Sequence, residues 1–127
     1  IYKKYQSWLK VTGLEMKETF RPDELSGGMK KRVSLIRGFL YNFDCILLDE
    51  PFSSIDIKMK NRIVDFIFDN YKDKTFIFVT HNIQDIPKMA ERLLIFEDDH
   101  LDKFQEKDIS KYEEPSRVVK EIYKALL

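Results

Sequence analysis

The stretch Asp44-Cys45-Ile46-Leu47-Leu48-Asp49-Glu50-Pro51 predicts the central strand of this chain. Its run of apolar residues is typical of a strand that is covered on both faces, as in a parallel sheet. Asp49 and Glu50 follow at the carboxyl end of the strand, where open α/β sheets place their chemistry, and Pro51 ends the strand. One of these acids could hold a hydrated Mg²⁺ while the other orients an attacking water. A strand followed by a solvated acidic turn explains this stretch alone equally well.

Residues 25–29, Leu-Ser-Gly-Gly-Met, predict the start of a helix that precedes this strand. Ser26 is a good N-cap for a helix over residues 27–41. Two glycines weaken the first turn, and cations there oppose the helix dipole; the cations are Lys30, Lys31 and Arg32. This arrangement makes sense if an anion binds at the helix start, where free N–H groups favour it. A solvated basic helix end with flexible glycines is the alternative.

The rest of the chain alternates between helical and strand patterns. Helices are predicted over residues 1–12 and 57–71, after Asn82 to about residue 90, and from residue 115 onward. Strands are predicted over residues 75–80, 93–96 and 101–104, with a hairpin turn at residues 98–100. Strands that alternate with helices indicate an α/β fold with a parallel sheet. We therefore predict a helical part over residues 1–42 and an α/β part over residues 43–127.

Composition narrows the possible classes of protein. The 127 residues carry 22 basic and 22 acidic side chains, so a strongly basic nucleic-acid-binding surface is not expected. The only cysteine, Cys45, excludes an internal disulfide and, inside a buried strand, predicts a buried and inert thiol. Neither a membrane-spanning run nor a signal peptide is recognisable, which points to the cytoplasm.

Three stretches, taken in order, resemble the nucleotide-binding domain of an ABC transporter. They are Leu25-Ser26-Gly27-Gly28, then Ile46 to Pro51 followed by Ser53-Ser54-Ile55-Asp56, then Thr80-His81. The first resembles the signature motif, the second the Walker B strand with its catalytic glutamate and D-loop, and the third the switch histidine. The resemblance extends from about Tyr5 to Phe104. Met29 and Phe52 resemble importer subunits, including those of the nitrate, sulfonate and taurine type.

The resemblance implies a partial P-loop NTPase fold, with a RecA-like parallel sheet and part of the ABC helical subdomain at the N-terminus. It also implies an ATPase whose cofactors are ATP and Mg²⁺. Asp49 would orient Mg²⁺ through water, Glu50 would act as general base, and His81 would contact the γ-phosphate. Positioning and electrostatic stabilisation are what phosphoryl transfer mainly requires.

The remaining implied roles lie at a subunit interface. Ser26 and the amides of Gly27 and Gly28 would bind the γ-phosphate of an ATP held mainly by a second nucleotide-binding subunit. Asp56 would couple the two subunits. The implied partners are that second subunit and the transmembrane permease subunits, which would place the chain on the inner face of the cell membrane. ATP hydrolysis would then power transport.

The sequence also departs from the family pattern. Met29 replaces a common glutamine, Asn82 replaces a common aspartate, and the alanine usual near Ser54 is missing. The phosphate-binding loop Gly-x-x-x-x-Gly-Lys-Ser/Thr does not occur in the 127 residues. We therefore expect a fragment that resembles the C-terminal half to two-thirds of such a domain. The alternatives are a catalytically inactive binding or assembly module and a non-transport ABC ATPase.

The missing loop also leads to an expectation for the sheet. From the resemblance we expect the strand before the phosphate loop to lie between residues 45–48 and 75–80. Without it, either these two strands pair directly or a partner chain supplies a strand, because unpaired buried edges are costly. In both cases we expect negligible ATP affinity for the chain alone.

Overall fold

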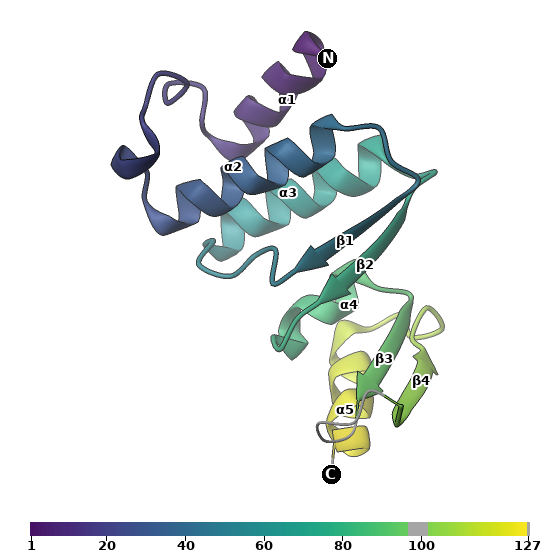
Figure 1. The fold of residues 1–127 in the computed structure, drawn as a ribbon. Helices are drawn as coiled ribbons and strands as arrows, with labels where there is room; N and C mark the ends of the chain where they lie inside the picture. Colours follow the sequence, from purple (N-terminus) through teal and green to yellow (C-terminus); the bar gives the residue numbers. More distant parts are fainter. Residues whose placement is uncertain (97–101, 127) are drawn as a thin grey trace. The chain divides into compact units, whose positions relative to one another are not determined.

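The computed structural model describes residues 1–96 and 102–126, and the chain divides into two units, Ile1–Val79 and Thr80–Leu127 (Figure 1). The first unit contains α1 (Tyr2–Thr12), the 3-10 helix η1 (Pro22–Glu24), α2 (Gly27–Leu40), β1 (Cys45–Asp49), α3 (Ile57–Asn70) and β2 (Thr75–Val79). The second contains the 3-10 helix η2 (Ile83–Asp85), α4 (Ile86–Met89), β3 (Arg92–Phe96), β4 (Phe104–Asp108) and α5 (Pro115–Leu126). No helix in this described part is both long and apolar enough to cross a membrane.

Local capping interactions set the helix boundaries of the first unit, and the predicted cap at Ser26 is confirmed. The Ser26 hydroxyl accepts a hydrogen bond from the Met29 N–H at 3.3 Å and starts α2. An Asp56 carboxylate oxygen accepts one from the Met59 N–H at 3.0 Å and starts α3. Gly13 ends α1 in the left-handed conformation, with φ of 65°. Each cap satisfies a backbone group that the helix itself leaves without a partner.

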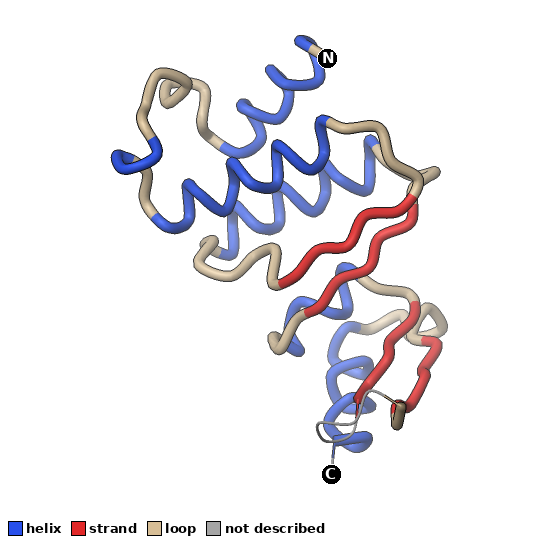
Figure 2. Tube along the Cα trace, viewed as in Figure 1, coloured by secondary structure: helices blue, strands red, loops and turns tan. Residues whose placement is uncertain are grey.

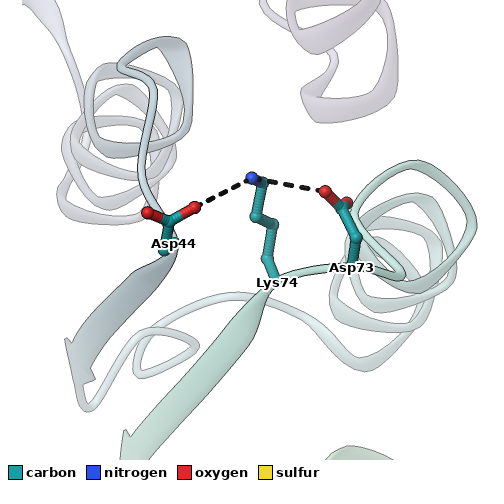
Figure 3. Close-up of polar contacts among 3 residues, drawn as sticks. All are labelled: Asp44, Asp73 and Lys74. Atoms are coloured by element: carbon teal, nitrogen blue, oxygen red, sulfur yellow. Dashed lines mark hydrogen bonds and ion pairs between the residues drawn. The ribbon is translucent and has the colours of Figure 1, made fainter.

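Strands β1 and β2 pair directly and in parallel, from Cys45 opposite Thr75 to Asp49 opposite Val79. Direct pairing is one of the two expected arrangements, and no strand lies between β1 and β2. Where the strands begin, the Lys74 ammonium group lies 3.4 Å from Asp44 and 3.3 Å from Asp73 (Figure 3). The hydrogen bond to Asp73, aided by Asp44, raises the pKa of Lys74. The Thr75 N–H also donates to the Asp44 carbonyl at 2.9 Å, which fixes the register of the pair.

The prediction that the strand now seen as β1 is covered on both faces is wrong. Burial alternates along β1 and β2, and the exposed face carries Leu47, Ile77 and Val79, which are 67%, 50% and 52% exposed. Cys45 lies on this face and is exposed, so the prediction of a buried thiol is also wrong. The physical reason is that the helices of the first unit lie on one side of the two strands (Figure 2).

Aromatic side chains form the core beneath the covered face of the sheet. Trp8 from α1 is fully buried, with its ring 4.8 Å from the ring of Phe39 in α2 and 5.0 Å from that of Phe66 in α3. Phe39 in turn stacks on Phe76 of β2 at 6.1 Å. The Trp8 indole N–H donates to the Tyr71 hydroxyl at 2.8 Å, and that hydroxyl contacts the Phe39 carbonyl at 3.3 Å. Three helices and the sheet therefore share one hydrogen-bonded aromatic core.

Replacing Tyr71 with phenylalanine is expected to lower the free energy of unfolding by about 1–3 kcal/mol, because the buried indole N–H of Trp8 loses its acceptor. Urea unfolding followed by circular dichroism measures this. Tyr41→Phe is the matched control, because Tyr41 is 74% exposed whereas Tyr71 is 6% exposed. An equal, small effect of both changes would contradict the role given to the Trp8–Tyr71 hydrogen bond.

The same variant tests a pH dependence. Burial raises the pKa of the Tyr71 phenol, although the Trp8 hydrogen bond opposes this shift. The stability that the neutral phenol contributes is therefore complete below its ordinary pKa of about 10 and is lost as pH rises through the higher folded value. Tyr71→Phe should reduce the alkaline loss of stability above about pH 10. The free energy of unfolding, measured from about pH 8 to about pH 11 in both proteins, checks this. An equal loss of stability with rising pH in the two proteins would contradict the role of the Tyr71 phenol.

The second unit has a small core of its own. Its central cluster of buried apolar residues consists of Ile86 of α4, Val118 and Ile122 of α5, and Ile109 after β4. Strands β3 and β4 pair antiparallel, from Arg92 opposite Asp108 to Phe96 opposite Phe104. The strand predicted over 93–96 is thus present, but it does not join the parallel sheet.

Two elements of the second unit differ in their boundaries from the prediction. The strand predicted over residues 101–104 is wrong in position, because β4 begins at Phe104 and its ladder continues to Asp108. The helix predicted up to Ala90 is shorter than expected, because η2 precedes a four-residue α4 that contains Pro87. The hairpin turn predicted at residues 98–100 lies outside the described residues.

Candidate functional site

The start of α2 presents hydrogen-bond donors to its surroundings. The Ser26 hydroxyl oxygen accepts from Met29, and the Ser26 carbonyl accepts from the Lys30 N–H at 2.9 Å. Among the described residues, the N–H groups of Gly27 and Gly28 have no acceptor, as expected for the first amides of a helix. Gly27 is exposed, and a methyl group placed on it would have no neighbour within 4 Å. An anion could reach these donors.

Only part of the positive charge predicted near this helix start is available for a ligand. The Arg32 guanidinium donates to the Thr12 carbonyl at 2.7 Å and to the Gly28 carbonyl at 3.2 Å. Arg62 of α3 donates to the Val11 and Lys10 carbonyls at 2.7 and 2.9 Å. The two arginines therefore satisfy the last carbonyls of α1 and complement its dipole. Arg32 has a structural role that the sequence pattern did not reveal.

The acid pair lies where β1 leads into a turn. Asp49 is exposed and is paired with Val79 in the sheet, and the Glu50 N–H donates to the Val79 carbonyl at 2.8 Å. Glu50 has a φ of 43°, a left-handed conformation that is uncommon for a residue other than glycine. The next residue but one, Phe52, is buried and holds the turn against the core. The backbone thus directs Glu50 out of the line of the strand.

An open hollow of about 150 Å³ lies between α2 and the end of β1. Its lining includes Lys31 and Ser34 from the helix, and Leu48 and Asp49 from the strand. Within residues 1–96 and 102–126, no three His, Cys, Asp or Glu side chains gather as a metal site. Asp49 would therefore be the one carboxylate that the described residues offer to Mg²⁺. Water and substrate phosphates would supply the other ligands, as is typical of this ion.

A close backbone contact joins the helix start to the turn. A methyl group placed on Gly28 would lie only 2.6 Å from the Ser54 carbonyl oxygen. Ser54 also has a left-handed backbone, with φ of 63°. The start of α2, the end of β1 and the cap of α3 at Asp56 therefore belong to one neighbourhood of the first unit. It contains six of the seven predicted site residues: Ser26, Gly27, Gly28, Asp49, Glu50 and Asp56.

His81 belongs to the second unit, two residues after β2 ends at Val79. It is exposed and lies in a short segment where the Asn82 N–H donates to the Thr80 hydroxyl at 3.1 Å and the Asn82 side chain accepts from the Gln84 N–H at 3.2 Å. Its role beside Asp49 and Glu50 stays a prediction.

Sequence reasoning did not single out Ser54 or Lys31 as parts of this neighbourhood. The dipeptide Ser53-Ser54 is ordinary turn composition, and a serine gives no sign of a left-handed backbone, which glycine or asparagine would have suggested. Lys31 appeared as one of three equivalent cations, and only folding separates it from Arg32.

Comparison with known proteins finds similarity to ABC transporters and to ATP-binding proteins of transport systems. The family model described as ABC transporter matches residues 2–53. The glycine betaine transport ATP-binding protein OpuAA of Bacillus subtilis is 36% identical over 95 residues, which are 73% of this chain and 23% of that protein. The aliphatic sulfonates import ATP-binding protein SsuB of Bacillus cereus is 33% identical over 94 residues, 72% of this chain and 38% of that protein. The chain thus spans less than half the length of these relatives.

Solved structures show the same fold. The dimeric post-hydrolysis structure of the ATP-binding cassette MJ0796, bound to ADP and Pi, matches with a TM-score of 0.72 and 27% identity. The match covers 87% of this chain and 47% of the cassette chain. The α/β fold with a parallel sheet is accordingly that of part of a P-loop NTPase, and the structure that it matches is an ATP-binding cassette. The relatives serve several solutes, so the predicted nitrate, sulfonate and taurine type is not specifically favoured.

Proposed function

We propose that this chain, which is similar to part of the ATP-binding proteins of transporters, supplies the signature helix, the acid pair and the switch histidine of an ABC-type ATPase. The ATPase would power transport across a membrane. One observation carries the proposal: the open start of α2 and the strained turn after Glu50 are in direct backbone contact in one unit. Residues 1–42 would form the helical part of this ATPase, and residues 43–127 would form its α/β part.

At the helix start, the Ser26 hydroxyl and the amides of Gly27 and Gly28 would donate hydrogen bonds to the terminal phosphate of ATP. The amides of Gly27 and Gly28 have no other acceptor among the described residues, which supports a ligand held mainly by a second subunit. Asp56 caps α3 with one carboxylate oxygen, and we propose that it also couples the two subunits.

At the strand end, Glu50 would accept the proton of the attacking water, while Asp49 would hold a water molecule of hydrated Mg²⁺. The ion would supply charge stabilisation to the phosphates. His81 would donate a hydrogen bond to the terminal phosphate. A second nucleotide-binding subunit and permease subunits would be the partners, with the chain on the inner face of the membrane.

A second candidate is a binding or assembly module without hydrolysis. It is favoured by one observation, the lack of a Gly-x-x-x-x-Gly-Lys-Ser/Thr loop in the 127 residues. In both cases the phosphate loop would come from outside these residues. Calorimetric titration of the chain alone with Mg-ATP should therefore give no binding below about 1 mM, a free energy weaker than about −4 kcal/mol. Micromolar binding by a monomer would contradict both candidates.

Photo-crosslinking distinguishes the two candidates. The assembly is isolated through an affinity tag on this chain and incubated with an ATP analogue whose terminal phosphate carries a photoreactive group. We expect labelling of the Ser26–Gly28 peptide that depends on Mg²⁺ and is competed by ATP, together with ATP hydrolysis by the assembly. Labelling without hydrolysis would favour the binding module. Hydrolysis without labelling of this peptide would contradict the proposed role of the helix.

A further inference from the structure

The two glycines at the start of α2 differ in what their missing side chains permit. A methyl group on Gly28 would lie 2.6 Å from the Ser54 carbonyl oxygen and 3.7 Å from its carbon, whereas one on Gly27 would meet nothing within 4 Å. A separation of 2.6 Å is far below ordinary carbon–oxygen contact, and the obstructing atom is backbone. Packing therefore requires glycine at position 28 but not at position 27.

The turn on the other side of this contact has little freedom to move away. Ser54 and Glu50 both have left-handed backbones, with φ of 63° and 43°, which persist only where the surroundings enforce them. The Ser53 N–H and hydroxyl both contact the Glu50 carbonyl, at 3.3 and 3.1 Å. The Ile55 N–H donates to the Phe52 carbonyl at 3.2 Å, and the buried Phe52 side chain holds the turn to the core. A shift of Ser54 would disturb both ends of the turn.

We propose that Gly28 is a positioning residue for the turn Phe52–Asp56, and that this contact makes the helix start and the turn change conformation together. The turn joins Glu50 to Asp56. The inference rests on the proposed function only for the roles given to these two residues. Its consequence is that phosphate held at the start of α2 and the carboxylate that activates water are coupled within one chain. Coupling of this kind is reciprocal, so a change in the turn also alters the helix start.

The first test uses the whole 127-residue chain, labelled with ¹⁵N, and three variants. Gly28→Ala should shift the amide resonances of Glu50 and of residues 52–56, and Gly27→Ala should shift only those near the start of α2. Gly28→Ala should also raise the unfolding equilibrium constant about tenfold relative to Gly27→Ala, because overpacking against backbone outweighs the gain that alanine brings to a helix. Adding Ser54→Gly to Gly28→Ala should restore most of the loss, since glycine lets the turn move aside.

Equal effects of Gly27→Ala and Gly28→Ala on the turn resonances would overturn the proposal, and so would a double variant as impaired as Gly28→Ala alone. If Gly28→Ala does not fold, the single variant Ser54→Gly decides the matter. It should shift the amide resonances of Gly27 and Gly28 as well as those of the turn, and a change confined to residues 52–56 would contradict the coupling.

The second test uses the assembly that contains this chain. Gly28→Ala should lower kcat for ATP hydrolysis at least tenfold while leaving KM for ATP within about twofold, because misplacement of the water-activating group affects the transition state more than the bound nucleotide. A rise in KM with an unchanged kcat would contradict the positioning role. An unmodified assembly that does not hydrolyse ATP would count against the proposed function alone, since the resonance test still decides the role of Gly28.

Discussion

Glu50→Gln is expected to lower ATP hydrolysis by the assembled subunits about 10²–10⁴-fold, the usual loss when a general base is removed. Glutamine keeps the shape and the left-handed backbone of Glu50 and its N–H bond to Val79, so the turn should be preserved. What it lacks is a carboxylate that can accept a proton from water. Nucleotide binding should therefore be unchanged while turnover falls.

Steady-state hydrolysis and equilibrium binding of ATP, measured on the same preparations, separate these effects. Glu15→Gln is the matched control, since Glu15 is exposed and lies in the connection after α1. It removes the same charge and should leave hydrolysis unchanged. Near-normal turnover in the Glu50→Gln variant would reject the assignment of Glu50 as the base.

Gly27→Asp is expected to reduce hydrolysis by about 10²-fold or more, because a carboxylate would occupy the place where the amides attract phosphate, and juxtaposed like charges cost several kcal/mol. The structure favours position 27 for this test over position 28. Any side chain at Gly28 meets the Ser54 carbonyl, whereas Gly27 faces open space. An aspartate in the first turn also stabilises a helix, so loss of activity could not be attributed to unfolding.

The control for this variant is Gly27→Asn, which has nearly the same shape without the charge. We expect Gly27→Asn to lose much less activity than Gly27→Asp, and we expect ATP binding by the subunit that carries the phosphate loop to be unaffected by either change. An equal loss in both variants would show that size, and not charge, is what position 27 excludes. The proposal that an anion binds at the start of α2 would then be contradicted.

The boundaries of the helices in the first unit were predictable because the interactions that set them are local. Ser26 caps a backbone amide three residues away, and so does Asp56. Gly13 ends α1 through its own backbone conformation. Such caps and the apolar patterns between them are written in consecutive residues, and for the same reason the acid pair and the glycines of the helix start could be recognised as candidates.

Other features depend on residues that are far apart in the chain. The exposure of Cys45 follows from helices covering one side of the two strands and not the other. The strand predicted over 93–96 pairs with β4 in a separate antiparallel sheet, because its run of apolar residues does not specify a partner strand. The boundaries of β4 were missed because its sequence Phe-Gln-Glu-Lys-Asp is mostly polar, so only its pairing with β3 defines the strand.

By itself, the sequence determined the α-helices of the first unit, the two parallel strands and the choice of candidate residues, because periodicity and capping act over a few residues. Only the tertiary structure decided that Arg32 binds the end of α1, across 20 residues of sequence, and that Arg62 does so across 51. It alone showed that Gly28 must lack a side chain because the Ser54 carbonyl occupies that space. The reason is that steric exclusion and buried hydrogen bonds arise between surfaces, and those surfaces exist only once the elements have packed.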